Sequence, residues 1–230
     1  MQPTPPIRPR SSLNIGAFNV RTLKQMGQQA ALARTLDSLA IAVCCICETR
    51  LYDSSTVVEL TAPSLTQRYY LHCSGDPTAE AVGQTGVGVV LNSRAEATLL
   101  DWIPISSCLC TIRLKTEIGI SSKCSTKRCL FVVAAYAPTN GSCDSAKDTF
   151  YAELSTLLRR AKNSDVVIFS GDMNAQLDRL GLSETQFGGR YGLEGQRTDN
   201  SERLLHLCSE HRLFLSSTAF RHKKSQCTTW

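Results

Sequence analysis

The stretch DVVIFSGDMNA (residues 165–175) joins a run of apolar residues to a polar tip. A continuous apolar run of this length is typical of a strand that is buried on both faces of a sheet. The run ends at Asp172, and Asn174 follows closely. Strand ends are where α/β folds gather functional groups, because the sheet holds them rigidly. The stretch therefore predicts a buried strand that presents Asp172 and Asn174 at the edge of a sheet.

Three further apolar runs also end in polar residues. These runs are LNIGAFNV (13–20) with Asn19, IAVCCICE (41–48) with Glu48, and CLFVVAAYAP (129–138) with Tyr136. Carboxylate and carboxamide oxygens are hard ligands suited to Mg²⁺, and such an ion can bind a phosphate oxygen. Each residue also has an ordinary explanation, as a turn former, a solvated strand end, or a core residue with its hydroxyl at the rim. The pattern alone leaves both interpretations open.

The rest of the chain alternates helix and strand patterns. Apolar residues recur at helical spacing in 24–40, 144–162 and 200–212, and shorter apolar runs predict strands at 86–92, 109–115 and 213–218. Polar or glycine-containing stretches predict loops at 117–128 and 178–199. Helices separate several strands, while other strands follow one another directly. This order predicts an α/β sandwich with mixed sheets rather than a purely parallel, doubly wound sheet.

The length and composition fit one α/β domain. The chain has 230 residues, of which 42% are hydrophobic and 20% are charged, and its net charge is +5. This mild basic bias permits a polyanionic partner without requiring one. The proline-rich residues 1–12 are predicted to form a disordered N-terminal segment, and residues 13–230 form the predicted domain. No apolar run approaches the roughly 18 residues that a membrane span needs, so no membrane partner is expected.

The cysteine content is high, with 11 residues. Many of them lie in apolar runs, where a free thiol behaves as a small hydrophobe. The N-terminus is polar and proline-rich rather than an apolar secretory signal, so we expect reduced thiols in a nuclear or cytoplasmic protein and not in a secreted one. Cys108, Cys110, Cys124 and Cys129 lie within a short stretch, but their spacing lacks the paired knuckles of zinc sites. Ordinary core and loop cysteines are the favoured explanation.

Four short sequence motifs occur along the chain, namely FNVRTL (18–23), CETRL (47–51), AYAPT (135–139) and SGDMNA (170–175). Together, in this order, they resemble the motifs of the endonuclease/exonuclease/phosphatase superfamily, which includes deoxyribonuclease I, apurinic endonucleases, inositol polyphosphate phosphatases and neutral sphingomyelinases. The longer forms GQQAALARTL (27–36) and ICETRL (46–51) are most similar to endonuclease domains of non-LTR retrotransposons, and to related host proteins of the craniofacial development protein 2-like type. The similarity runs from about residue 13 to the end.

This resemblance implies a four-layer αββα sandwich and a divalent cation, Mg²⁺ or Mn²⁺. It implies that Glu48 is the principal metal ligand, with Asn19 beside it. Asp172 would orient or deprotonate the attacking water, or protonate the leaving group. Asn174 would donate a hydrogen bond to the scissile phosphate, and Tyr136 would contact the phosphate or the leaving oxygen. A phosphate displacement needs a cation, neutral donors and a positioned base as charge develops.

The sequence also departs from the superfamily pattern. Members carry a further Asp on a later strand and a final Ser-Asp-His motif. Neither feature appears after Asp172 in this chain. None of the four histidines directly follows an Asp. Members of the superfamily usually continue beyond a Thr-Trp motif such as Thr229-Trp230. We therefore expect a C-terminally incomplete sandwich that lacks the final strands. Its activity should be weak or absent, because loss of an acid–base partner costs about 10²–10⁴ in rate.

The sequence supports three functional hypotheses. The first is a metal-dependent phosphodiesterase that nicks DNA, as the endonuclease domain of a retrotransposon-type protein; its partner would be a reverse transcriptase encoded with it, which the resemblance alone implies. The second is a non-catalytic nuclear interaction module derived from such a domain. The third is a phosphoesterase that acts on lipid or inositol phosphates. Basic residues, mostly in predicted loops, fit a DNA partner or a solvated surface equally: Arg21, Lys24, Arg50, Lys123, Lys127, Arg128, Arg221, Lys223 and Lys224.

Overall fold

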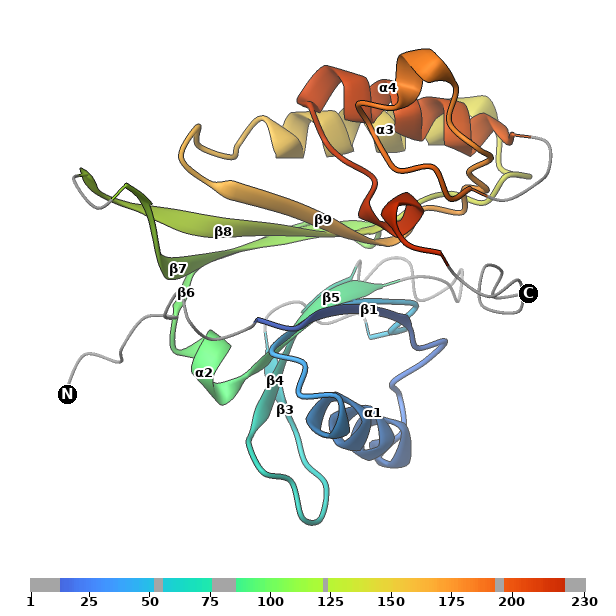
Figure 1. The fold of residues 1–230 in the computed structure, drawn as a ribbon. Coiled ribbons are helices and arrows are strands. Elements are labelled where there is room, and N and C mark those ends of the chain that lie inside the picture. Colours follow the sequence, from blue (N-terminus) through green and yellow to red (C-terminus); the bar gives the residue numbers. More distant parts are fainter. Residues whose placement is uncertain (1–12, 52–55, 76–85, 122–123, 193–196, 222–230) are drawn as a thin grey trace. The chain divides into compact units, whose positions relative to one another are not determined.

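The structure is a computed structural model that describes residues 13–51, 56–75, 86–121, 124–192 and 197–221. It divides into two compact units, drawn in Figure 1 with the sequence colours. The first unit contains residues 1–136 and 159–172, and the second contains residues 137–158 and 173–230. The predicted N-terminal segment, 1–12, lies outside the described residues.

Among the described residues, the first sheet of the first unit has the strand order β1-β2-β5-β4-β3. The strands are β1 Ile15–Asn19, β2 Val43–Cys47, β3 Val57–Leu60, β4 Tyr69–Ser74 and β5 Val87–Asn92. β1 and β2 are parallel, and the other neighbours are antiparallel. α1 (Met26–Ser38) provides the crossover that two parallel strands require. α2 (Ser93–Glu96) follows β5 as a single turn.

β2 is buried on both faces, because its side chains alternate between two cores. Val43, Cys45 and Cys47 belong to one core cluster. Cys44 and Ile46 belong to the other cluster, together with the buried leucines of α1. This double burial explains why the run is continuously apolar, since each fully buried aliphatic side chain contributes about 1.5–3 kcal/mol.

The second sheet has the strand order β6-β7-β8-β9 among the described residues. The strands are β6 Leu99–Ser106, β7 Leu109–Ser121, β8 Cys124–Tyr136 and β9 Val166–Asp172; only β8 and β9 are parallel. The two sheets stack face to face (Figure 1), and one core cluster contains Val43 and Val89 from the first sheet and Ile112 and Val132 from the second. The predicted α/β sandwich with two mixed sheets is therefore confirmed.

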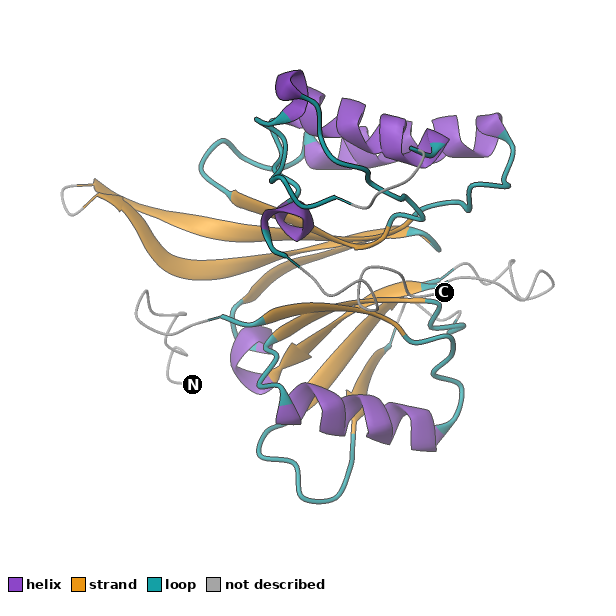
Figure 2. Cartoon of the chain, turned by 45° about the vertical axis from the view of Figure 1, so that its right-hand side comes forward, coloured by secondary structure: helices purple, strands orange, loops and turns teal. Residues whose placement is uncertain are grey.

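The second unit is built around two helices, α3 (Asp144–Leu158) and α4 (Asp199–His211), which pack side by side (Figure 2). Their facing sides are apolar, and Leu154 and Leu204 are buried. Lys147 is buried as well, and its Nζ donates to Asp199 Oδ2 at 3.0 Å. Two short 3₁₀ helices, η2 (Leu182–Glu184) and η3 (Ser216–Ala219), complete the unit.

Three parts of the predicted secondary structure are wrong. The predicted strand 213–218 contains η3 instead, and it pairs only through an isolated bridge between Gly188 and Leu215. Phe214 in this apolar run is 56% exposed, so the run does not mark a buried strand. The predicted loop 117–128 belongs to the β7–β8 pairing, which continues through two register shifts. Backbone hydrogen bonds hold such a ladder, and they do not require an apolar sequence.

The third error is one of omission, since the sequence patterns did not predict β3, β4 or β6. β6 is an edge strand that contains Pro104 and has register shifts on either side of it. Proline is tolerated in edge strands because the missing N–H faces away from the ladder. Such a strand interrupts the two-residue periodicity on which its prediction depends.

The four closely spaced cysteines do not come together as a zinc site within the part of the chain that is described. Cys110 is fully buried in the core cluster, as ordinary packing produces, and the side chain of Cys124 lies outside the described residues. The described residues contain no group of three or more His, Cys, Asp or Glu that could hold a metal ion. In the same ranges, no helix has the length and apolarity needed to cross a membrane.

Candidate active site

The carboxyl ends of β1 and β2 lie at the same edge of the first sheet. The two strands are parallel, and Asn19 is paired with Cys47 at their last residues. Glu48 is the next residue after β2. In the second sheet, β8 and β9 are also parallel, and Tyr136 is paired with Asp172 at their last residues. Four of the predicted site residues therefore stand at or just beyond strand ends of one unit.

Glu48 connects the two sheets at this edge. Asn19 Nδ2 donates to Glu48 Oε1 at 2.5 Å, and the hydroxyl of Tyr136 donates to the same oxygen at 3.0 Å. Asn19 and Glu48 come from the first sheet, whereas Tyr136 comes from the second. A carboxylate that receives two donors from two sheets is fixed more firmly than a solvated strand end. We name this group of three side chains the Glu48 cluster.

Asp172 lies beside the Glu48 cluster, because it pairs with Tyr136 at the last position of β8 and β9. Burial, followed by the negative charges of Asp172 and Glu48, raises the pKa of the Cys47 thiol to about 12. Burial is also the first cause that raises the pKa of Tyr136, with the charge of Glu48 second and that of Asp172 a smaller one. Tyr136 therefore stays protonated at neutral pH and acts as a neutral hydrogen-bond donor.

Unusual backbone conformations surround the cluster. Arg21, Glu48 and Arg50 have φ values of 58°, 59° and 54°, in the left-handed region that residues other than glycine rarely adopt. Each such residue costs of order 1–3 kcal/mol and persists only where the surrounding structure determines it. Residues of this kind concentrate at functional sites. Here they lie immediately after the ends of β1 and β2.

The surroundings that hold Glu48 in this conformation are its buried neighbours. Thr49 is 0% exposed; its N–H donates to Gly86 O at 3.0 Å, and its carbonyl accepts from Leu23 N at 2.9 Å. Gly86 has a φ of 98°, and a Cβ there would collide with the hydroxyl of Thr49. Only glycine fits this position without displacing the segment that carries Glu48.

The residues of the Glu48 cluster fit a small divalent cation. Glu48 Oε1 receives the hydrogen bonds from Asn19 and Tyr136, and Oε2 receives none from the described residues, so one carboxylate oxygen remains for an ion. Asn19 contacts this carboxylate through Nδ2, and its Oδ1, the atom that could bind an ion, accepts from Arg21 N at 3.1 Å. Mg²⁺ is commonly held by one or two carboxylates and completes its coordination with water and substrate oxygens. A site with few protein ligands therefore suits Mg²⁺ better than a metal that needs a cage of protein side chains.

Asn174, the fifth predicted residue, belongs to the second unit. Its backbone is also left-handed, with a φ of 46°. Its Nδ2 donates to Ala137 O at 2.7 Å, and its carbonyl accepts from Asn200 Nδ2 at 3.1 Å. The structure thus brings Asn19 and Tyr136 into contact with Glu48, and within the second unit it binds Asn174 to Ala137 and Asn200.

Several residues that build the site were missed in the sequence. Thr49 and Gly86 determine the backbone at Glu48, and Asn200 binds the backbone at Asn174. The close approach at Gly86 agrees with the sequence, because the glycines of the predicted strand 86–92 indicate close backbone approach. Asn200 stands in the first turn of a predicted helix, and nothing in the local pattern distinguishes it from a capping residue.

Basic side chains flank the cluster in the sequence and at the surface. Arg21 lies two residues after Asn19, and Arg50 lies two residues after Glu48; both are exposed, as is Lys24. Arg221 is exposed in the second unit, and Arg128 is partly buried. The predicted basic residues Lys123, Lys223 and Lys224, and the side chain of Lys127, lie outside the described part.

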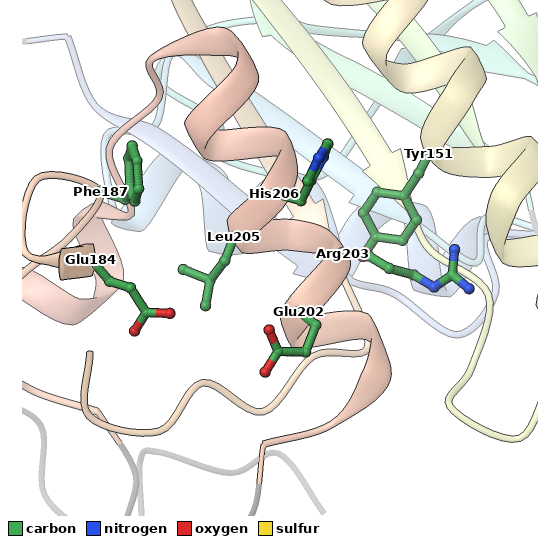
Figure 3. A pocket seen from close by; sticks show the side chains of 7 residues that line it. All are labelled: Tyr151, Glu184, Phe187, Glu202, Arg203, Leu205 and His206. Atoms are coloured by element: carbon green, nitrogen blue, oxygen red, sulfur yellow. The ribbon is translucent and has the colours of Figure 1, made fainter. Parts of the chain in front are cut away.

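A pocket of about 640 Å³ lies on the second unit and contains none of the predicted site residues (Figure 3). Four of its lining side chains come from α4, and the full lining is Tyr151, Glu184, Phe187, Glu202, Arg203, Leu205 and His206. The charged groups are already engaged: Glu184 binds Arg197 through both carboxylate oxygens, and Arg203 Nε donates to Asp199 at 2.9 Å.

No protein-family model matches the sequence, and no curated protein matches it. Solved structures do match. An AP endonuclease from Leishmania major is 15% identical over 90% of this chain and 72% of its own, with a TM-score of 0.55. The endonuclease domain of TRAS1, a telomere-specific non-LTR retrotransposon, is 13% identical over 87% and 71%, with a TM-score of 0.50. The catalytic domain of Xenopus laevis APE2 is 17% identical over 75% and 63%, with a TM-score of 0.48.

Sequence identities this low show a similarity of fold alone. In this chain, that fold consists of two mixed sheets stacked face to face, with polar side chains at the ends of the parallel strands. The chain shares its fold with these two endonuclease structures, from Leishmania major and from TRAS1.

Proposed function

We propose that this chain is a metal-dependent phosphodiesterase domain that nicks DNA. The observation that carries the proposal is the Glu48 cluster, in which Asn19 and Tyr136 donate from two different sheets to one carboxylate oxygen. A strand end that served only as a solvated cap would not need a buried neighbour, a left-handed backbone and two donors. Strained, pre-organised side chains are typical of sites that act on a substrate.

Glu48 and Asn19 would hold Mg²⁺ or Mn²⁺. When bound, this ion supplies Lewis-acid stabilisation of the charge on the phosphate. Asp172 would accept a proton from the attacking water, or orient it, because a carboxylate at a rigid strand end can serve as a general base. Tyr136 would donate a neutral hydrogen bond to the phosphate or the leaving oxygen, which its raised pKa permits at neutral pH. Asn174 would donate to the scissile phosphate.

DNA is the proposed substrate because exposed basic residues follow both metal-binding strand ends. Arg21 and Arg50 would each neutralise a backbone phosphate, which makes binding depend on salt. The net charge of +5 favours a polyanion. The similarity to the TRAS1 endonuclease domain supports the further proposal that the chain works in a retrotransposon-type protein, alongside a reverse transcriptase.

The test is conversion of supercoiled plasmid to the nicked circle in the presence of Mg²⁺. We expect weak nicking, because the final Ser-Asp-His motif is missing, and we expect a chelator to abolish it and Glu48→Gln or Asp172→Asn to reduce it by about 10²-fold or more. Glu59→Gln is the matched control, since Glu59 is a surface carboxylate on β3, 44% exposed and paired only with Arg68 among the described residues.

The same purified protein can distinguish a DNA nuclease from an inositol phosphate phosphoesterase and from a non-catalytic binding module. An abasic duplex and an inositol phosphate are offered beside the plasmid. Turnover of the inositol phosphate alone would retain the hydrolase and replace its substrate. Absence of turnover on all three substrates, with the fold intact, would contradict the proposed function and favour a binding module.

A further inference from the structure

Asn200 lies in the first turn of α4 and is 0% exposed. Its side-chain amide has two hydrogens, and the structure gives each a different acceptor. Nδ2 donates to Pro138 O at 2.8 Å and to Asn174 O at 3.1 Å. These two carbonyls belong to segments that are 36 residues apart in the sequence, 138 and 174. One carboxamide therefore joins two distant segments of backbone.

The positions of the two carbonyls are related to the proposed site. Pro138 is two residues after Tyr136, and Asn174 is two residues after Asp172. Tyr136 and Asp172 are themselves paired at the last position of the parallel strands β8 and β9. The Asn200 amide thus binds the first turns of chain that follow both strand ends. We name this bridge the Asn200 clamp.

Neighbouring contacts fix the clamp in place. The backbone carbonyl of Asn200 accepts from the Tyr151 hydroxyl at 3.0 Å, which ties it to α3. Ser201 Oγ donates to Gln176 O at 2.6 Å, which holds the same loop two residues further on. Asn200 Oδ1 is buried with no partner among the described residues. The side chain is therefore placed for its two donor bonds, since the opposite amide orientation would set an oxygen against two carbonyls.

We propose that Asn200 is a positioning residue that fixes Asn174 for phosphodiester hydrolysis; this inference rests on the proposed function. Asn174 has a left-handed φ of 46°, and its own Nδ2 is bound to Ala137 O. A residue in this conformation relaxes unless its peptide is held. Asn200 holds the Asn174 carbonyl, and through Pro138 it holds the segment that contains the acceptor of the Asn174 side chain.

The test uses the full 230-residue chain and two variants. Asn200→Asp keeps the shape and removes both donors, and Asn200→Ala removes the whole amide. Thr218→Ala is the matched control, because Thr218 is buried in the same unit and its hydroxyl bonds Gly189 and Leu215 rather than the clamped segments. We expect kcat for plasmid nicking to fall about 10- to 100-fold in both Asn200 variants, as small misplacements do. KM for DNA should change by less than about twofold, since the phosphate-binding groups stay.

Hydrogen–deuterium exchange provides the readout that does not depend on activity. In both Asn200 variants, peptides covering 137–142 and 173–178 should exchange faster, while those covering α1 and the centre of α3 stay protected. A normal kcat, or unchanged exchange in the two segments, would overturn the proposal. Faster exchange throughout α3 and α4 would also overturn it, because Asn200 would then serve the stability of the unit as a whole.

The two proposals can fail separately. If the wild-type chain does not nick any DNA substrate, the proposed function fails, and the exchange pattern alone decides whether the clamp holds the two segments. If the wild type nicks and the Asn200 variants nick equally well, the clamp fails and the function stands.

Discussion

Removal of the Tyr136 hydroxyl tests whether its hydrogen bond to Glu48 stabilises the contact between the two sheets. Tyr136→Phe removes the donor to Glu48 Oε1 at 3.0 Å and leaves the ring in place. A hydrogen bond to a charged group contributes about 1.5–3 kcal/mol when buried. Glu48 keeps its bond from Asn19, and Tyr136 is only partly buried. We therefore expect the free energy of unfolding to fall by about 1–2 kcal/mol.

Urea unfolding of a double-mutant cycle isolates this bond. Tyr136→Phe and Glu48→Ala, separately and together, should show a coupling energy of about 1 kcal/mol. Tyr69→Phe is the control in the same unit, since the Tyr69 hydroxyl contacts Gln67 and Asp37. Its combination with Glu48→Ala should be additive within about 0.3–0.5 kcal/mol. Additivity of the Tyr136 and Glu48 changes would refute the reasoning, because the bond between the sheets would then contribute nothing.

The same variant separates stability from catalysis. If Tyr136 donates to the phosphate or the leaving oxygen, Tyr136→Phe should reduce the nicking rate by about 10²-fold, the usual effect of removing one positioned donor. The rate is measured well below the unfolding temperature, so that the lost stability does not contribute. A normal nicking rate combined with the expected coupling energy would leave Tyr136 a structural role alone.

Three further predictions concern the framework around the site. Asp165→Ala should lower the free energy of unfolding by about 3 kcal/mol, because the buried Arg113 then keeps only its longer ion pair with the half-exposed Asp101; the side chains of Asp165 and Arg113 are 1% and 12% exposed, and replacing both by apolar residues should cost much less in the same urea titration. Gly171→Ala should prevent native β8–β9 pairing, since a Cβ there would collide with the β8 backbone, and loss of soluble folded protein or of circular-dichroism strand signal checks this. The Arg197 hydrogen bonds lower the pKa of Glu184 from 4.5 to about 2, so the carboxylate stabilises the fold above pH 4.5 and this contribution disappears as the pH falls to about 2; thermal melts should lose more stability over that interval in wild type than in Glu184→Gln.

Much of the Glu48 cluster could be predicted because each member ends an apolar run. Buried strands such as 43–47 and 166–172 are visible as continuous apolar sequence, and parallel strands bring their carboxyl ends to one edge. A residue at the end of an apolar run could therefore be placed at the edge of a sheet from the sequence alone. The contact between Tyr136 and Glu48 depends in addition on how two sheets stack, and no local pattern encodes that.

The missed elements lack such a pattern. β6 lies at a sheet edge with Pro104 in its middle, and 213–218 is apolar without being paired. Asn200 looks like an ordinary polar residue at a helix start, and its importance comes from two carbonyls that are distant in the sequence. Residues that act through long-range hydrogen bonds become recognisable only once the backbone is in place.

The bond between Tyr136 and Glu48 joins residues that are 88 positions apart. Contacts of such large sequence separation form late, because a long loop must close before they can be made. A nascent chain that has reached only the first sheet therefore contains the proposed ligands Glu48 and Asn19, but it lacks the Tyr136 donor to Glu48. The complete Glu48 cluster, with its donors from both sheets, would form only when the two sheets have docked.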